Sequence, residues 1–281
     1  MIQEPVLAPV LALERSRGLA RVGFALRDGR AVLTDLAQAG SAKVLLPHVA
    51  GAPEAVFLNT SGGLTSGDRL GYAVRLGDGV TATATTQTAE RAYLARDGAA
   101  RVEVAAQVGA GGRLVWLPQE TILFEDSHLD RQTGIALAAG ASVVLAESVV
   151  LGRRAMGEAP RRAHLFDRRH VTLAGRPLWI EAQRLDAGVL AMGDTPALLA
   201  GNVAFAVVAF CGAGAEAAVD ALRALPVPPG VQAAVTGWNG RCIARALAPD
   251  GWPLKQWLGR IAARLTGAPL PRTWQMQGLT P

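Results

Sequence analysis

The amino-acid sequence predicts a mainly β protein that ends in a small α+β portion. Two observations support this prediction. From Leu19 to about Leu190, short runs alternate between apolar and polar side chains with a period of two residues, and glycine-rich turns separate them. After Leu190 the pattern changes to longer apolar runs and to helical spacing. The alternation is typical of a large antiparallel sandwich or of a stack of β layers.

The change of pattern divides the chain into a β body, residues 1–190, and an α+β portion, residues 191–281. We expect both to pack on one core as one structural domain, because 281 residues lie near the upper limit, about 250–300 residues, for a single hydrophobic core. The chain is 50% hydrophobic and 18% charged. This composition suits a deep core and argues against a disordered chain.

Within the β body, the alternation is clearest at residues 101–104, 141–145 and 170–173. Glycines mark turns at residues 28–29, 77–79, 97–98 and 109–112. No convincing helix interrupts this region. The strands could stack as rungs, but no repeat of fixed period predicts a solenoid from the residues alone.

The α+β portion contains three predicted strands and two predicted helices. The strands cover residues 203–210, 231–236 and 241–247. The first helix covers residues 216–225 and ends before Pro226 and the prolines that follow it. The second helix covers residues 254–265, where apolar side chains recur at helical spacing: Leu254, Leu258, Ile261 and Leu265.

The net charge of +5 does not predict a nucleic-acid partner. Of 28 basic residues only two are lysines, the arginines are scattered, and aromatic residues make up 5% of the chain. A nucleic-acid-binding surface gathers its charge on one face and adds aromatic side chains for stacking. The tightest basic cluster contains Arg161, Arg162, Arg168 and Arg169. We interpret it as a solvated face, with a docking patch as the alternative.

Cysteine spacing and apolar runs predict a cytoplasmic protein without a membrane partner. Cys211 and Cys242 lack disulfide-rich spacing, and we interpret both as buried thiols. The N-terminal stretch lacks a basic region and is interrupted by Pro9, which argues against a secretory signal. The longest apolar run, residues 203–215, is too short to span a bilayer.

The glycine-rich segment 59–68 resembles a phosphate-binding loop only superficially. Such a loop needs a lysine after its last glycine and opens a helix, whereas here Asp68 would repel a phosphate and a strand follows. We therefore expect nucleotide hydrolysis to belong to a partner. Considered alone, the segment predicts a tight turn in which glycines adopt positive φ.

No catalytic set is recognisable, and the chain is predicted not to be an enzyme. The sequence lacks the G-x-S-x-G and H-E-x-x-H patterns and any Cys/His pair in a local context. His164 and His170 would lie about 20 Å apart on an extended strand, too far to bind one metal ion. We expect a structural role for both.

Two carboxylates, Glu147 and Glu181, lie within apolar strands. Burying such a charge is costly unless it is paired or solvated, so each predicts an arginine partner or an internal polar passage. Together with Asp68 and Glu120 they could offer oxygen ligands for weak, transient contacts with a divalent metal ion. Too few soft ligands are present for a tightly bound metal.

Five segments form an ordered set of motifs. They are residues 58–68 with Gly62, Gly63, Gly67 and Asp68; residues 85–93; residues 116–124 with Pro118, Gln119 and Glu120; residues 151–158 with Gly152, Arg153 and Glu158; and residues 271–274 with Arg272 and Trp274. In this order they resemble the urease accessory protein family UreD, also called UreH. Thr60, Ser66, Asp126 and Ser127 depart from the usual residues of that family.

The resemblance implies a β-helix-like stack of sheets with two helices. It also implies that the chain binds apo-urease and UreF, and through UreF the GTPase UreG. This GTP-dependent complex would insert nickel into the urease active site, and it allows a dimer of the chain. Nickel would be transient cargo, with no cofactor tightly bound.

Two hypotheses about mechanism follow from the resemblance. In the first, nickel passes along an interior route that Asp68, Glu147 and Glu181 touch. In the second, the chain is a rigid bridge between urease and UreF without metal contact. Exposed apolar surface of the helix at residues 254–265 would then be the main contact with UreF.

Overall fold

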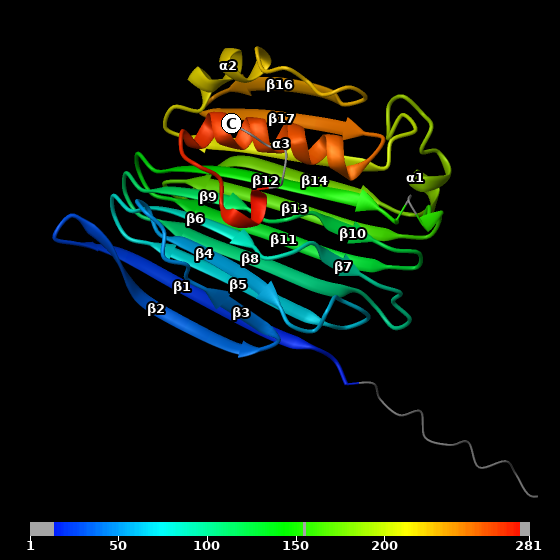
Figure 1. Ribbon diagram of the computed structural model, residues 1–281, viewed down its shortest axis with the longest axis horizontal. Helices are drawn as coiled ribbons and strands as arrows, with labels where there is room; N and C mark the ends of the chain where they lie inside the picture. The colour runs from blue at the N-terminus through cyan, green and yellow to red at the C-terminus, as the bar shows by residue number, and fades with distance from the viewer. Residues whose placement is uncertain (1–13, 154–155, 276–281) are drawn as a thin grey trace, which may run out of the picture.

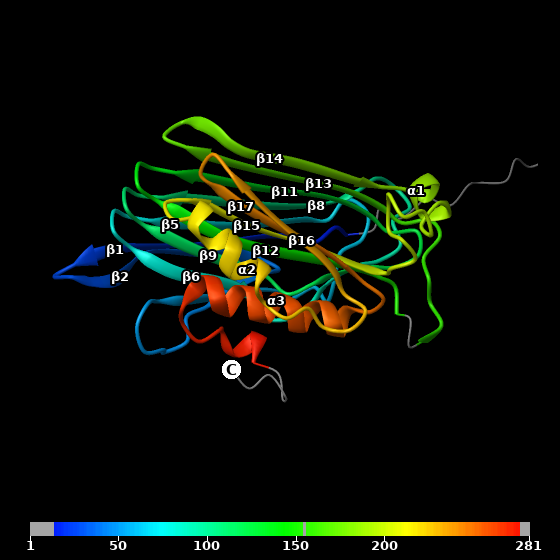
Figure 2. The ribbon, with the colours of Figure 1, turned by 90° about the horizontal axis from the view of Figure 1, so that it is seen from above.

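Two β-sheets packed face to face form the body of the protein (Figures 1 and 2). The computed structural model describes residues 14–153 and 156–275. Sheet A contains, in spatial order, β14 (Arg176–Leu185), β13 (His164–Leu173), β11 (His128–Leu137), β8 (Ala100–Val108), β5 (Arg69–Leu76), β1 (Arg17–Arg27) and β2 (Arg30–Gly40). Sheet B contains β16 (Gln232–Trp238), β17 (Arg241–Ala248), β15 (Ala204–Gly212), β12 (Ser142–Leu151), β9 (Arg113–Leu117), β6 (Thr81–Thr86), β4 (Glu54–Asn59) and β3 (Ala42–Leu45).

The strands in the middle of each sheet are parallel. In sheet A, β1, β5, β8, β11 and β13 pair in parallel, and so do β4, β6, β9 and β12 in sheet B. The chain crosses between the sheets after each central strand, so that β5 with β6, β8 with β9 and β11 with β12 form successive rungs. This arrangement confirms the β-helix-like stack.

Among the strands of the described residues, antiparallel pairs occur only at the ends of the stack. They join β1 to β2, β13 to β14 and β3 to β4, and they add β15, β17 and β16 to β12. The alternative of a large antiparallel sandwich is therefore wrong for the body. The two-residue alternation of side chains is the same in both kinds of strand, so it does not distinguish them.

Two short strands lie beside the rungs at one end of the sheets. β10 (Thr121–Leu123) pairs in parallel with β12 and with β7 (Glu90–Ala92). Both strands fall inside motifs of the sequence, residues 85–93 and 116–124. The pairing therefore brings two motifs into direct contact.

The main core lies between the two sheets. In β8 every second residue is buried, as expected for a strand with one face on the core and one in solvent. In β12 nearly every residue is buried. Sheet A covers one face of β12, and helix α3 (Gly251–Thr266) covers the other. Figure 2 shows these three layers.

Both predicted helices are confirmed, with different bounds. The first is a 3₁₀ turn (Glu216–Ala218) followed by α2 (Val219–Arg223). The second, α3, begins at Gly251 because Asp250 caps its N-terminus: the Asp250 side chain accepts a hydrogen bond from Trp252 N at 2.8 Å. A third short helix, α1 (Ala187–Ala191), was not predicted and is capped by Asp186.

The apolar stripe of α3 is not an exposed surface, which corrects the prediction made for residues 254–265. Leu254, Trp257, Leu258 and Ile261 are all buried against sheet B. The spacing of apolar residues predicts a buried face, and here the strands of the same chain bury it. The stripe is therefore not available to UreF in this fold.

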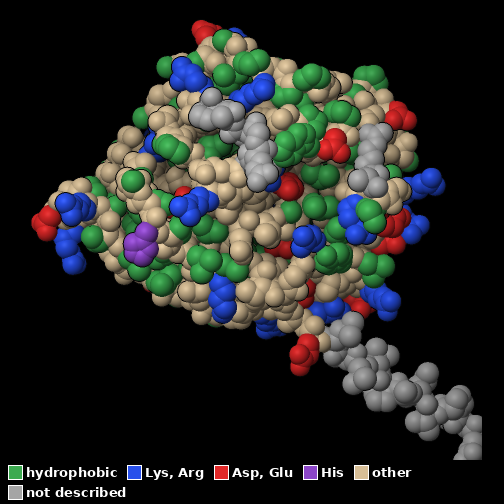
Figure 3. Space-filling model, viewed as in Figure 1, with side chains coloured by type: hydrophobic (Ala, Val, Ile, Leu, Met, Phe, Trp, Pro, Cys, Tyr) green, Lys and Arg blue, Asp and Glu red, His purple; other side chains and the backbone are tan. Residues whose placement is uncertain are grey.

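Two further predictions concern thiols and membranes. Cys211 and Cys242 are free and buried, as predicted. Within the described part of the chain, no helix has the length and apolar character needed to cross a membrane. On the face that carries α3, Lys and Arg side chains are dispersed among other side chains (Figure 3).

Candidate functional site

Three of the sequence motifs line one internal cavity of about 70 Å³. Residues 58–63 form one wall, residues 86–91 a second, and residues 116–121 a third. The inner end of the cavity reaches two buried charged side chains, Arg131 and Glu147. A space of this size holds a few water molecules. The motifs therefore surround a cavity that has both apolar and polar side chains in its lining and reaches a buried ion pair.

The first wall is a loop that glycines and Asp68 hold in place. Gly62, Gly63 and Gly67 all have positive φ, which confirms the predicted turn. A Cβ atom at Gly63 would lie 2.4 Å from the Tyr93 ring, so that only glycine fits there. The Asp68 carboxylate accepts hydrogen bonds from Ser16 N and Thr65 N, both at 2.8 Å. Asp68 thus ties the loop to the preceding chain.

The second wall contributes the carboxylate of Glu90. Its oxygens accept hydrogen bonds from Arg91 N at 3.0 Å and from the Asn59 side-chain amide at 3.3 and 3.4 Å. Burial raises the pKa of Glu90, and these hydrogen bonds only partly offset that effect. Glu90 is therefore a cavity carboxylate that accepts a proton more readily than glutamate in water.

The third wall is the segment Pro118, Gln119 and Glu120. Gln119 N donates a hydrogen bond to Thr86 Oγ1 at 2.8 Å, and the side chain is 5% exposed. Lys255 of α3 donates hydrogen bonds to the side-chain oxygens of Gln119 and Glu120. Because Glu120 is paired with this lysine at 3.0 Å, it lies at the junction with α3 and not at the inner end of the cavity.

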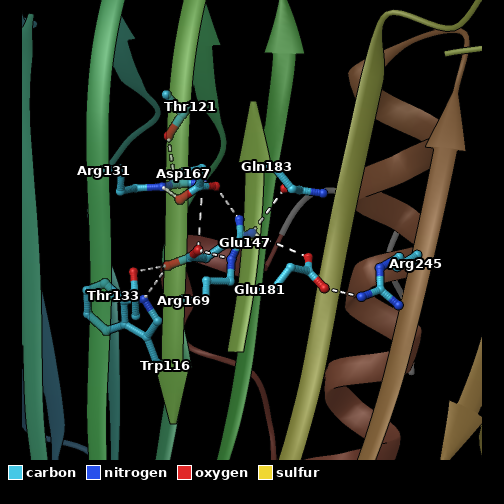
Figure 4. Close-up of polar contacts among 10 residues, drawn as sticks. All are labelled: Trp116, Thr121, Arg131, Thr133, Glu147, Asp167, Arg169, Glu181, Gln183 and Arg245. Carbon is cyan, nitrogen blue, oxygen red and sulfur yellow. Dashed lines mark hydrogen bonds and ion pairs between the residues drawn. The ribbon is translucent and has the colours of Figure 1, made fainter. Parts of the chain in front are cut away.

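Behind the cavity, four charged side chains form a buried cluster that joins the two sheets (Figure 4). Glu147 projects from β12 of sheet B, and Arg131, Asp167 and Arg169 project from sheet A. Arg131 Nε donates to Asp167 Oδ1 at 3.0 Å, and Arg169 Nε donates to Glu147 Oε2 at 2.7 Å. Arg169 also pairs with Asp167. Two cations and two anions thus balance one another.

The oxygens of Glu147 are fully engaged. Oε1 accepts hydrogen bonds from Thr133 Oγ1 at 2.8 Å and from the indole of Trp116 at 3.3 Å. Burial alone would raise the pKa of Glu147, but Arg131 and Arg169 outweigh it and hold the pKa well below its ordinary value. Glu147 is therefore ionised at neutral pH, and the predicted arginine partners are present.

The polar contacts continue from this cluster to the edge of the sheets. Arg169 Nη1 donates to Gln183 at 3.0 Å and lies 3.6 Å from Glu181. Glu181 pairs in turn with Arg245, whose side chain is 49% exposed. Gln183 and Arg245 line a groove of about 540 Å³. A polar track of side chains thus joins the motif cavity to this groove through the core (Figure 4).

The structure separates the four candidate metal ligands. It brings Glu147 and Glu181 together around Arg169, but it places Asp68 in the loop and Glu120 beside Lys255. No group of three or more His, Cys, Asp or Glu side chains able to hold a metal ion occurs in residues 14–153 and 156–275. The four candidate carboxylates are thus dispersed through the fold rather than gathered in one place.

The predicted solvated arginine cluster also divides. Arg162 pairs with Glu125 and Asp126, and Arg168 with Asp130, all in partly exposed positions. Arg169, in contrast, is 2% exposed and belongs to the buried cluster, so the prediction is wrong for this residue. The alternation along β13 points residues 167 and 169 inward and residues 166 and 168 outward.

The remaining motif residues lie outside the cavity lining. Gly152 has positive φ, and a Cβ there would lie 2.7 Å from Glu158 O; Arg153 pairs with Glu158 at 3.0 Å. The Trp274 indole is buried and donates to Leu117 O at 2.8 Å. Arg272, in the same turn, is exposed. The fifth motif thus packs directly behind the third.

Sequence reasoning missed three residues of this site: Glu90, Arg131 and Asp167. Arg131 and Asp167 lie on strand faces that also carry buried apolar residues, but polar residues adjoin both in sequence. The signal that Glu147 gives, a charge within a continuous apolar run, is therefore absent for them. Glu90 gives no such signal, because its neighbours Gln87, Thr88 and Arg91 are polar. Its partial burial depends on tertiary contacts such as that with Asn59, which the sequence does not show.

The fold and the site define a β-solenoid scaffold with a polar track through its core. The family model described as UreD urease accessory protein matches residues 16–275. A urease accessory protein UreD of Cereibacter sphaeroides is 54% identical and covers 94% of this chain and 96% of the relative. UreD proteins of Paracoccus denitrificans and Rhizobium leguminosarum bv. trifolii are 47% and 39% identical, and each alignment covers at least 94% of both chains. The chain belongs to the UreD urease accessory protein family, which confirms the resemblance seen in its motifs.

Proposed function

We propose that this chain is a cytoplasmic scaffold for nickel insertion into urease. It binds apo-urease and UreF, recruits the GTPase UreG through UreF, and offers nickel ions an interior route between these partners. Membership of the UreD urease accessory protein family supports a role in urease maturation and a non-catalytic part in it. Nickel is the cargo of this complex and is bound only in transit.

The single observation that carries the interior route is the polar track through the core. The track begins at the cavity formed by three motifs and ends at the groove near Arg245. Most cores of this size exclude charge, because burying it is costly. The charged side chains that pair from β11 to β17 are therefore costly to bury. Passage of a cation would give a reason for their presence.

The charge balance of the track suits transit better than storage. Each carboxylate of the track, Glu147, Asp167 or Glu181, is already paired with an arginine. A divalent ion would have to displace an arginine to gain a carboxylate ligand, which keeps its binding weak. Conduction requires sites that favour entry but also permit release.

Amide substitutions test the route. Glu147→Gln and Glu181→Gln remove carboxylates of the track, and Asp68→Asn removes the loop carboxylate. We expect the first two to lower urease activation, measured with UreF, UreG, GTP and nickel, while the complex with urease still forms in size-exclusion chromatography. Asp35→Asn is the matched control, because Asp35 pairs with Arg21 on the outer face of sheet A and should leave activation unchanged.

Loss of stability must be separated from loss of the route. The double variant Glu147→Gln/Arg169→Gln removes one charge of each sign and leaves Arg131 paired with Asp167. If activation requires the carboxylate, this variant stays inactive although its charges balance. Full activation by Glu147→Gln, Glu181→Gln and Asp68→Asn, each in an intact complex, would contradict the route.

The second hypothesis is a rigid bridge without metal contact. It predicts full activation by all three amide variants. The buried ion pairs favour it in one respect, since they lock the two sheets together and would stiffen a bridge. The contact with UreF would then lie on surfaces other than the buried stripe of α3. Substitution of exposed α3 residues such as Trp252, followed by a UreF pull-down, tests whether the outer side of α3 takes part.

A further inference from the structure

Two histidines lie side by side at the end of sheet A where β11 and β13 begin. His128 is the first residue of β11 and His164 the first residue of β13, and the parallel register pairs them directly. Both side chains are exposed, and their ring centroids lie 5.3 Å apart with an angle of 44° between the rings. The register thus joins two imidazoles that are 36 residues apart in sequence.

This separation matches two imidazoles bound to one metal ion. A ring nitrogen lies about 2.0–2.1 Å from a bound zinc ion, so each ring centroid lies about 3.2 Å from the metal. Angles of about 90–109° between the two bonds then place the centroids about 4.5–5.2 Å apart. The observed distance of 5.3 Å lies just above this range.

The surroundings of the pair leave room for a metal ion and its water ligands. A hollow of about 360 Å³ opens over the rings, and Asp126, Arg96 and Arg162 share its lining. The Asp126 carboxylate is held by Arg162, with contacts of 2.7 and 3.0 Å. Asp126 is thus a third candidate ligand in the hollow, but its carboxylate is paired with the guanidinium of Arg162.

The charges around the pair nearly cancel. Asp130, two residues after His128 on the same face, pairs with Arg168, and Arg162 also contacts Glu125. Burial and the neighbouring His164 lower the pKa of His128, while Asp130 opposes the effect. A neutral imidazole is the form that binds a metal ion.

We propose that His128 and His164 form a surface site for a first-row divalent transition-metal ion such as Ni²⁺. The two imidazoles supply the protein ligands, and water fills the other positions. Imidazole suits nickel, copper and zinc, and a site with two protein ligands binds them reversibly rather than as a structural ion. The inference goes beyond the interior route and does not depend on it, because the site lies on the outer face of sheet A.

Calorimetric titration of the tag-free full-length chain with Ni²⁺, without partner proteins, tests the site. We expect saturable binding that weakens at least tenfold, on the order of one lost ligand bond, in His128→Ala and in His164→Ala. His170→Ala is the matched control, because His170 is exposed on the same strand and its register partners are Gly134 and Ile180. It should bind as the wild type does.

A second variant probes the occupied carboxylate. Arg162→Gln frees Asp126 to act as a third ligand, so it should tighten Ni²⁺ binding, and His164→Ala in that background should cancel the gain. Absence of saturable binding by the wild type, or equal binding by the wild type, His128→Ala and His164→Ala, would overturn the proposal. Because no urease is present, either result leaves the proposed function to its own experiment.

Discussion

At the scale of single residues, Glu90 differs from Glu147 and Asp167 in the partners of its carboxylate. Glu147 and Asp167 contact arginines, whereas the hydrogen-bond donors to Glu90 among the described residues are amide groups of Asn59 and Arg91. Amide donors stabilise a carboxylate less than a guanidinium does. The burial of Glu90 is therefore not fully compensated, which explains why its pKa is raised.

This imbalance predicts that Glu90→Gln stabilises the protein at neutral pH. Above the raised pKa, the folded state carries a buried charge that the unfolded chain keeps in water, so the wild type loses stability as the pH rises through this window. The urea midpoint of Glu90→Gln should exceed that of the wild type at pH 7.5. The difference should vanish below the ordinary pKa of glutamic acid, about 4.3.

Glu103→Gln serves as the control for Glu90→Gln, because Glu103 is exposed on the outer face of β8. Its urea midpoint should follow that of the wild type at both pH values. A lower midpoint for Glu90→Gln at pH 7.5 would show that the ionised carboxylate stabilises the fold.

The glycines of the first motif give a matched pair of substitutions. Gly62 and Gly63 both have positive φ, but a Cβ at Gly62 meets no atom within 4 Å, whereas a Cβ at Gly63 meets the Tyr93 ring at 2.4 Å. Gly62→Ala should cost about 1–2 kcal/mol of unfolding free energy for backbone strain alone. Gly63→Ala should cost clearly more in the same urea titration. Equal costs would mean that Tyr93 moves aside freely.

Charged residues of the site were predictable from sequence only where an apolar strand surrounds them. Glu147 and Glu181 give this signal, and both have the arginine partners that it predicts. The sequence could not show which arginines would be the partners, because Arg131 and Arg169 belong to other strands. The interior role suggested for Asp68 rests on the motif alone, and its observed contacts are those of a loop-stabilising residue.

At the scale of elements, the C-terminal segment secures α3 and the third motif to each other. Trp274 is buried, its indole donates to Leu117 O, and Lys255 of α3 lies 5.8 Å from its ring centroid. Leu117 O also accepts a hydrogen bond from Thr85 Oγ1 at 2.6 Å. One carbonyl thus joins three motifs.

Trp274→Ala should therefore lower the free energy of unfolding by about 3–5 kcal/mol, the usual cost of removing a buried tryptophan. Trp252→Ala provides the control, since Trp252 lies in α3 but is 47% exposed. Its effect should stay within about 0.5 kcal/mol, as for most surface changes. Chemical denaturation followed by circular dichroism measures both. A small effect for Trp274→Ala would mean that the fifth motif is not part of the cooperative core.

Long or strongly patterned elements were predictable, and short ones were not. The helix at residues 254–265 and the strands at residues 203–210 and 241–247 agree with α3, β15 and β17. β7 and β10 have only three residues each, too few for any periodicity to be recognised. They exist because neighbouring strands offer them hydrogen-bond partners, which is a tertiary cause.

At the scale of the whole molecule, the buried ion-pair cluster fastens sheet A to sheet B. Glu147→Gln removes a carboxylate that both Arg131 and Arg169 contact and leaves them Asp167, with Glu181 3.6 Å from Arg169. Breaking a buried pair in this way typically costs about 3–5 kcal/mol. The double variant Glu147→Gln/Arg169→Gln should recover much of this loss, because removal of both partners is often close to neutral. Urea titration of both variants measures the recovery. Equal destabilisation by the single and double variants would argue against a charge effect.

Acid unfolding should show the same cluster. The pKa of Glu147 is lowered in the folded state, so its ionised carboxylate stabilises the fold. This stabilisation is present above the ordinary pKa of glutamic acid and is lost as the pH falls through the lowered value.

Register is the property of the whole fold that sequence could not supply. Two-residue alternation shows which side chains share a face of a strand, but not which residue of another strand lies beside them. The parallel pairing of β11 with β13 decides that His128 meets His164, while sequence spacing alone directed attention to His164 and His170. Parallel stacking follows from the crossing of the chain between the sheets. The alternation of side chains does not show where the chain crosses.

The cover of sheet B by α3 has a consequence for synthesis of the protein. The ribosome makes residues 251–266 after every strand in the described part of the chain, so the apolar outer face of β9, β12 and β15 stays open until then. A nascent chain at that stage presents a broad sheet without its lid, the kind of surface that general chaperones hold and that associates with other chains. Synthesis and docking of residues 251–266 is therefore the step that covers this apolar face.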